Sequence, residues 1–253
     1  GHGIYQYDSL LVGAGFTGLD AVTLFLAIPV LLVSAVLYHR GSARGGLLLA
    51  GTLAYFLYDY ASRAFGAAYN NLFLVYVALF SASLFAFALT FASFDLRRLP
   101  SCFSPAMPRR VIATYLVAVC GLLAALGVGD VVAALARDSV PRALGSYTTV
   151  VTYALDLGIV APAALAAAAL LLRRKPAGYL LASTLLTVNV TLGVALMAQG
   201  TAILMAGVQM PVGQIAGLIG SCAVLSVIGV GLMVTVLRGV SSDGAASDVR
   251  YAA

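Results

Sequence analysis

Residues 19–40 read LDAVTLFLAIPVLLVSAVLYHR, and this stretch decides the fold class. Its first 20 residues, 19–38, contain one charged side chain, Asp20, and the run ends at His39 and Arg40. At about 1.5 Å of rise per residue, a helix of this length spans about 30 Å, which is the thickness of the hydrocarbon core of a bilayer. The stretch therefore predicts a membrane-spanning helix.

Six further apolar runs of similar length follow along the chain, at residues 46–66, 71–93, 111–128, 148–172, 178–199 and 213–237. The expected fold is an all-α, polytopic transmembrane bundle of about seven helices that forms one domain over residues 1–253. Three segments fall outside these runs. Residues 129–146 are expected to form a connector with room for a short surface helix, residues 200–212 an outer loop or surface-lying segment, and residues 239–253 a flexible cytoplasmic tail.

The composition supports a membrane protein and excludes several chemistries. Hydrophobic residues make up 62% of the chain and charged residues 9%, with a mean hydropathy of +1.04. Soluble domains carry about 25% charged residues. The single lysine, Lys175, lies in a predicted loop, which excludes a retinal Schiff base within a helix. His2 and His39 lie outside membrane depth, so neither haem nor another cofactor or metal is expected.

No enzymatic activity is expected from these motifs. The chain contains no Glu, so a His/Glu metalloprotease motif is absent from the sequence. One alternative stays open: Asp59 paired with Asp156 or Asp20 could form an aspartyl site, in which two carboxylates share a proton. No flanking motif supports it, and Arg63 would hold Asp59 ionised.

The basic residues predict the orientation of the chain. The loops on the opposite side receive only Arg137 and Arg142. Because cytoplasmic loops carry the excess of Lys and Arg, we expect the Gly1 end outside and the C-terminus inside, in a bacterial inner membrane. The net charge of +5 marks this orientation and not a nucleic-acid partner. Eleven of the 14 basic residues fall on the predicted inner side: Arg40, Arg44, Arg97, Arg98, Arg109, Arg110, Arg173, Arg174, Lys175, Arg238 and Arg250.

Two stretches of the chain read alike. The first contains Pro29, then Arg40, then GLLLAGTL from residue 46, and the second contains Pro162, then Arg173, then GYLLASTL from residue 178. The spacing from Pro to Arg is 11 residues in both. The pattern predicts a parallel repeat with halves 1–93 and 111–238 and, by analogy with the helix at 111–128, one more helix before Gly1. The alternative is chance similarity between helices rich in Leu, Ala and Gly.

A few polar side chains are predicted at membrane depth, where ionisable groups usually face a partner or a cavity. Asp59 lies 15 residues past Arg44, or about 22 Å from the inner face, and Arg63 follows at the i, i+4 spacing of an ion pair. Tyr55 lies on the same stripe, and Asp20 lies near the outer end of its helix.

Two more polar groups are expected at a similar level. Asp156 lies 17 residues before Arg173, or about 25 Å up, and Asn189 lies 14 residues past Lys175, or about 21 Å up. All of these groups fall in the outer half of the bilayer, which predicts a polar floor open to the outside. The alternative is an ion pair and an interhelical amide with only structural roles.

Residues 55–85, YFLYDYASRAFGAAYNNLFLVYVALFSASLF, resemble a stretch of uncharacterised bacterial membrane proteins. Residues 156–182, DLGIVAPAALAAAALLLRRKPAGYLLA, are similar to the second half of those proteins. The resemblance implies a polytopic protein of the bacterial inner membrane and carries over no activity and no site residue.

These patterns favour a membrane protein that binds or moves a small cationic or zwitterionic solute through an outward-facing polar pocket. The candidate pocket residues are Asp59, Arg63, Asp156, Asn189, Tyr55 and Asp20. The alternative is a structural or accessory subunit that serves other membrane subunits or a homo-oligomer in the lipid bilayer.

Overall fold

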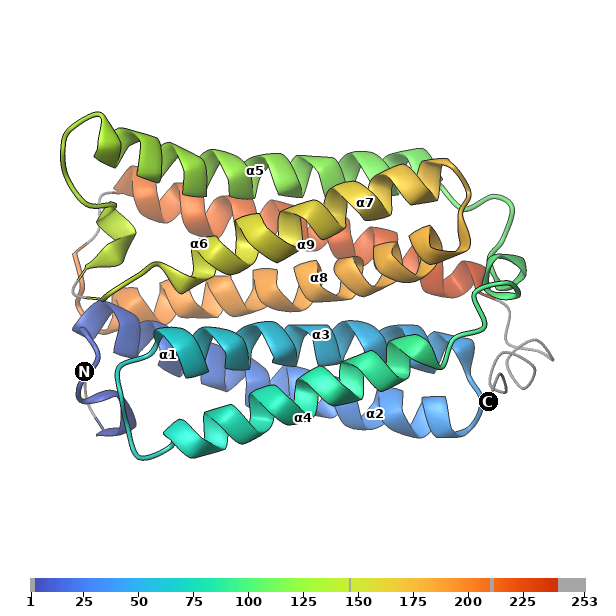
Figure 1. The fold of residues 1–253 in the computed structure, drawn as a ribbon, viewed down its shortest axis with the longest axis horizontal. Helices are drawn as coiled ribbons and strands as arrows, with labels where there is room; N and C mark the ends of the chain where they lie inside the picture. Colours follow the sequence, from blue (N-terminus) through green and yellow to red (C-terminus); the bar gives the residue numbers. More distant parts are fainter. Residues whose placement is uncertain (1–2, 146, 210–211, 241–253) are drawn as a thin grey trace.

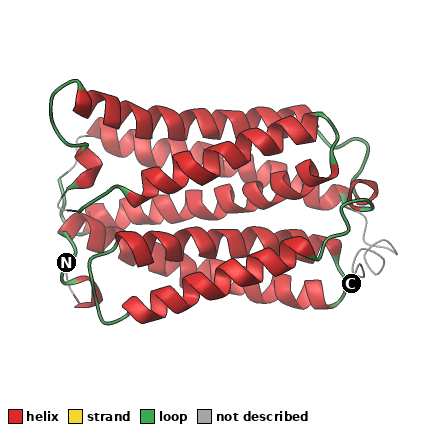
Figure 2. Ribbon diagram, in the orientation of Figure 1, coloured by secondary structure: helices red, strands yellow, loops and turns green. Residues whose placement is uncertain are grey.

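The computed structural model describes residues 3–145, 147–209 and 212–240, and these residues form a bundle of long helices that lie side by side (Figure 1). Figure 2 shows helices joined by short loops, and the described residues contain no β-strand. One isolated bridge pairs Phe103 with Val240. The predicted all-α bundle is therefore confirmed.

The helical segments follow one another along the chain and cross the bundle in alternating directions (Figure 1). Their bounds are η1 Gly3–Tyr5, α1 Leu10–Val22, η2 Thr23–Ala27, α2 Ile28–His39, α3 Ala43–Gly66, α4 Phe73–Ala92, η3 Leu99–Cys102, α5 Arg109–Leu135, η4 Arg142–Leu144, α6 Val151–Leu155, η5 Asp156–Val160, α7 Ala161–Leu172, α8 Pro176–Met205 and α9 Val212–Gly239.

Seven helices cross the described bundle, because α1, η2 and α2 form one continuous helix and α6, η5 and α7 form another. Six of the seven are long and apolar enough to span a membrane, which fits a multi-pass membrane protein. The seventh, α3, is more polar and largely buried. It packs against α2, α4, α6 and α8, so its polar side chains lie inside the protein and not against lipid.

The two ends of the bundle differ in charge. At one end, which we call the basic end, α2, α4, α7 and α9 finish and α3, α5 and α8 begin. The other end, the acidic end, carries the N-terminal segment, residues 3–9, and every described aspartate except Asp95 lies in that half or its loops. Ten basic side chains lie at the basic end: Arg40, Arg44, Arg97, Arg98, Arg109, Arg110, Arg173, Arg174, Lys175 and Arg238.

The helices begin or end further toward the acidic end than the sequence indicated. The first helix begins at Leu10 and not at residue 19, α5 continues to Leu135 and not 128, and α8 continues to Met205 and not 199. The expected outer loop or surface-lying segment at residues 200–212 is therefore wrong over residues 200–205 and at residue 212, and the expected connector at residues 129–146 is wrong over residues 129–135. The expected tail lies outside the described residues from residue 241 onward.

Close packing between α1 and α8 explains two of these extensions. A Cβ atom on Gly18 would lie 2.4 Å from the backbone oxygen of Ala198, and one on Gly15 would lie 2.9 Å from the Gln199 amide. Glycine disfavours a helix in isolation, but here its missing side chain lets two helices approach and stabilise each other. In α5 the additional turns accommodate Asp130, whose carboxylate accepts hydrogen bonds from Tyr153 and from the backbone of Ala143.

Both of these continuous helices contain a five-residue π-helical segment just before a proline. In η2 the backbone N–H of Ile28 bonds the carbonyl of Thr23, and in η5 that of Ala161 bonds Asp156. The proline that follows, Pro29 or Pro162, has no N–H and clashes with the carbonyl four residues earlier, so the helix widens there.

The two stretches share further local structure at an offset of 133 residues, from Thr23 to Asp156. Each α-helix after the π segment has an arginine as its C-cap residue, Arg40 or Arg173, and the next residue has left-handed backbone, Gly41 at φ 87° or Arg174 at φ 55°. A Cβ on Gly45 would meet the backbone of residues 37 and 38, and a Cβ on Gly178 would meet that of residues 170 and 171. In its contacts, Gly178 therefore corresponds to Gly45. The sequence comparison had paired Gly178 with Gly46, which is one residue further along the chain.

Candidate functional site

The candidate residues of the first helix and α3 meet around one guanidinium group. Arg63 Nε lies 3.0 Å from Asp59 Oδ2, as the i, i+4 spacing predicted, and Arg63 Nη1 lies 3.0 Å from Asp20 Oδ1. The side chains of Arg63 and Asp59 are 2% and 5% exposed, whereas that of Asp20 is 49% exposed. We call these three residues, with Tyr5, the Arg63 network.

The N-terminal segment closes over this network. The Tyr5 hydroxyl accepts a hydrogen bond from Arg63 Nη1 at 2.8 Å and donates one to Asp20 Oδ2 at 2.7 Å. Burial raises the pKa of Tyr5, with Arg63 acting in the opposite direction, so this hydroxyl stays protonated. The ring of Phe16 lies 4.9 Å from the Arg63 guanidinium carbon and the ring of Tyr76 lies 5.9 Å from it. Aromatic faces stabilise a buried cation at such distances.

The Arg63 network retains unused hydrogen-bonding capacity. Arg63 Nη2 and the Tyr76 hydroxyl are both buried, and neither has a hydrogen-bond partner among the described residues. If all three charged groups are ionised, the network also carries one negative charge in excess.

Asp156, at the start of η5, belongs to a second network, which contacts α3 on another face. Its Oδ1 accepts a hydrogen bond from the Tyr58 hydroxyl at 2.9 Å, and its side chain is half-buried. Among the described residues, no Lys, Arg or His lies within ion-pair distance of Asp156. This carboxylate is therefore the one candidate that a phenol holds without help from a cation.

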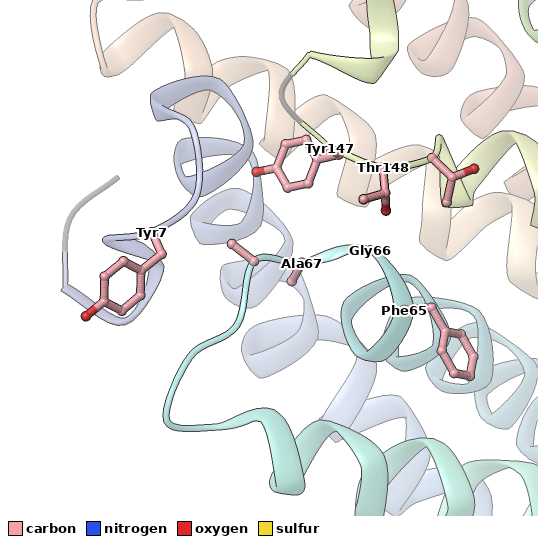
Figure 3. A pocket seen from close by; sticks show the side chains of 8 residues that line it. Tyr7, Phe65, Gly66, Ala67, Tyr147 and Thr148 are labelled. Atoms are coloured by element: carbon pink, nitrogen blue, oxygen red, sulfur yellow. The ribbon is translucent and has the colours of Figure 1, made fainter.

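A cavity of about 290 Å³ opens at the acidic end of the bundle, beside the seam between α3 and α6 (Figure 3). Figure 3 shows Phe65, Gly66 and Ala67 on one side of it and Tyr147 and Thr148 on the other. Its lining residues are Tyr7, Phe65, Gly66, Ala67, Ala68, Tyr147, Thr148 and Thr149.

Along α3, the cavity lies nearer the acidic end than the Tyr58–Asp156 pair. On α3, Tyr58 precedes Phe65 by seven residues, which is about two turns or 10 Å along the helix axis, and Asp156 follows the cavity residue Thr149 along the chain at the start of η5. Ser62 lies between Tyr58 and Phe65 on α3, where its hydroxyl bonds the Tyr58 carbonyl. The cavity and the carboxylate are therefore separated by about two turns of α3.

The structure divides the six predicted site residues. It brings Asp20, Asp59 and Arg63 together, and it places Asp156 with Tyr58. Tyr55 is fully buried and its hydroxyl lies 3.1 Å from Thr23 Oγ1. Asn189 is half-buried on α8, and no described hydrogen bond connects it with either network.

The residues of the N-terminal segment were not among the predicted site residues. Asp8 is buried, and its Oδ1 accepts hydrogen bonds from the backbone of Ala68 at 2.9 Å and from the Tyr147 hydroxyl at 2.8 Å. The available signal was the polar run YQYDS at residues 5–9, which ends in Ser9, the N-cap of α1.

No family model, no curated protein and no solved structure matches this chain, which agrees with its resemblance to uncharacterised membrane proteins.

Proposed function

We propose that this chain binds a small cationic or zwitterionic solute at Asp156 and moves it across a bacterial inner membrane. The observation that carries the proposal is a half-buried carboxylate in a membrane-spanning helix whose described partner is a phenol and not a cation. An ionised carboxylate at membrane depth costs about 2.5–3.5 kcal/mol, so it gains from a cation or a proton. The cavity at the acidic end offers the route of entry.

The π segment that begins at Asp156 supports the same assignment. Single π-helical turns within longer helices are frequent at functional sites because they re-aim side chains and free backbone groups. Here the widened turn carries the carboxylate toward Tyr58 on the polar helix α3. A carboxylate that holds a proton in one state and a solute cation in another would couple the movement of the proton to the movement of the solute.

The proposed direction of solute movement rests on the charge of the two ends of the bundle. The basic end would face the cytoplasm because Lys and Arg are retained there, and the acidic end with its cavity would face outside. A solute would then enter between Phe65 and Thr148 and descend to Asp156.

The test is a thermal-shift screen of the purified protein with choline, putrescine, lysine and glycine betaine. A bound solute raises the unfolding midpoint in proportion to RT ln(1 + [L]/Kd). We expect at least one solute to raise the midpoint of the wild type and of Asp95→Asn, the matched control at the basic end. The shift should disappear in Asp156→Asn. A shift that survives in Asp156→Asn, or no shift with any of the four, contradicts the proposal.

One observation favours a second function, that of an accessory subunit of a membrane complex. Arg63 forms ion pairs with two carboxylates of the same chain, as expected of a buried contact that holds the helices of a scaffold together. In that case Asp59→Asn changes assembly or detergent stability, whereas Asp156→Asn leaves both unchanged and no solute shifts the midpoint.

A further inference from the structure

Asp20 differs from its two partners in the Arg63 network because its side chain remains open. It is 49% exposed, while Arg63 and Asp59 are nearly inaccessible. A carboxylate offers about four lone-pair positions. The structure uses two of them, one for Arg63 and one for Tyr5, so the open side of Asp20 can accept further donors.

The open side of Asp20 continues into an apolar surface. Leu24, Ile28 and Leu32 follow it at steps of four residues and are 56%, 36% and 61% exposed. This spacing places them along one side of the continuous first helix, and we call them the apolar stripe. Phe25, 78% exposed, lies beside the stripe.

Depth separates the carboxylate from the stripe. Asp20 lies 19 residues before His39, the last residue of α2, so it stands about 28 Å from the basic end. The hydrocarbon core is about 30 Å thick, which puts Asp20 near the far headgroup layer and the apolar stripe within the hydrocarbon. A ligand with an ammonium group in its head and an apolar chain matches this order.

The charge of the network selects the sign of the head. Two carboxylates and one guanidinium leave one negative charge that the described partners do not neutralise. A primary ammonium supplies the missing charge together with three N–H donors for the free lone pairs. A head group with a phosphate and no ammonium would be repelled.

We propose that Asp20 and the apolar stripe bind an aminophospholipid, with its ammonium on the Asp20 carboxylate and an acyl chain along Leu24, Ile28 and Leu32. The lipid comes from the surrounding bilayer and not from the cavity. This site is independent of the solute site at Asp156, so either can be absent without the other.

The test titrates the purified protein with dioleoyl phosphatidylethanolamine and follows the lipid-bound species by native mass spectrometry. Dioleoyl phosphatidylglycerol carries the same chains without the ammonium, and free ethanolamine carries the ammonium without the chains. We expect the ethanolamine lipid to bind about tenfold more tightly than either, since one charge-assisted contact contributes about that factor. Equal binding of the two lipids, or equal binding of free ethanolamine, overturns the proposal.

Three variants locate the site. Asp20→Asn should remove the preference for the ethanolamine lipid, and Asp95→Asn should keep it. Because Asp20→Asn also weakens the Arg63 network, Phe25→Ala provides a second probe at a side chain that is 78% exposed and outside that network. Phe25→Ala should weaken binding of the ethanolamine lipid several-fold and leave the binding of free ethanolamine unchanged. Full retention of lipid binding in both Asp20→Asn and Phe25→Ala overturns the assignment.

Discussion

Thr23 and Asp156 occupy equivalent places in two π-helical segments, and each side chain bonds a tyrosine of α3. Thr23 meets Tyr55 at 3.1 Å and Asp156 meets Tyr58 at 2.9 Å. The geometry is shared but the chemistry is not, because one contact joins two neutral hydroxyls and the other joins a phenol to an ionisable carboxylate. The proposed solute chemistry therefore belongs to the second segment, and the first provides an internal reference for it.

The Thr23–Tyr55 contact should behave as a buried neutral hydrogen bond. Thr23→Val or Tyr55→Phe alone leaves one hydroxyl without its partner, which we expect to lower the free energy of unfolding by about 1–3 kcal/mol. The double variant removes both hydroxyls and should cost less than the sum of the two. Unfolding midpoints of the four proteins in one detergent give the coupling energy, and strict additivity would show that the contact does not form.

Loss of Arg63 should be the most damaging change among the charged residues. Arg63→Ala leaves the buried Asp59 without its cation and we expect it to cost about 3–5 kcal/mol. Arg98→Ala is the control, since Arg98 is exposed and its 3.5 Å pair with Asp95 contributes about 1 kcal/mol or less. The measurement is the midpoint of thermal unfolding. Similar midpoints for the two variants would mean that the Arg63 network is not buried.

Close approach of α1 and α8 makes a specific prediction for Gly18. In Gly18→Ala the new Cβ would lie 2.4 Å from the Ala198 oxygen, so α1 must move away and the midpoint should fall. Gly121→Ala on α5 is the matched control because its Cβ enters open space, and it should be neutral or stabilising by up to about 1 kcal/mol. An unchanged midpoint for Gly18→Ala would place the two helices further apart.

The Asp8–Tyr147 contact predicts a pH dependence at the alkaline end. Burial raises the pKa of Tyr147, and the hydrogen bond to Asp8 raises it further. The unfolded chain then releases this proton near pH 10, before the folded protein does, so the free energy of unfolding should fall as the pH rises above about 10.

Unfolding midpoints between pH 9 and 11 test this dependence. Tyr147→Phe should flatten the decline relative to the wild type, and Tyr7→Phe should not, because Tyr7 is 69% exposed. An identical decline in Tyr147→Phe and wild type would assign it to other groups.

The sequence predicted the helices best where charge marks their ends. At the basic end the predicted and observed limits agree within a few residues, as at Leu172 and Ala92. At the acidic end α1 and α8 extend past the apolar runs because Gly15 and Gly18 let them pack together. That packing depends on two helices distant in sequence, so hydropathy alone could not reveal it.

The candidate site, too, was predictable within one helix and not between helices. The Asp59–Arg63 pair follows from a spacing of four residues on one helix, and it was predicted. Whether Asp20 or Asp156 joins it depends on how each helix is rotated about its axis, and the π segments change that rotation. Pro29 and Pro162 signalled a disturbance in each helix but not its direction.

The N-terminal segment joins the two halves of the chain at one end of the molecule. Asp8 holds the loop after α3 through Ala68 and the loop before α6 through Tyr147. At the other end Arg44 reaches across to the Val240 carbonyl with two hydrogen bonds of 2.9 and 2.6 Å. Any rocking of one half against the other has to break one of these ties, so a cysteine cross-link across either end should freeze the protein with that end shut.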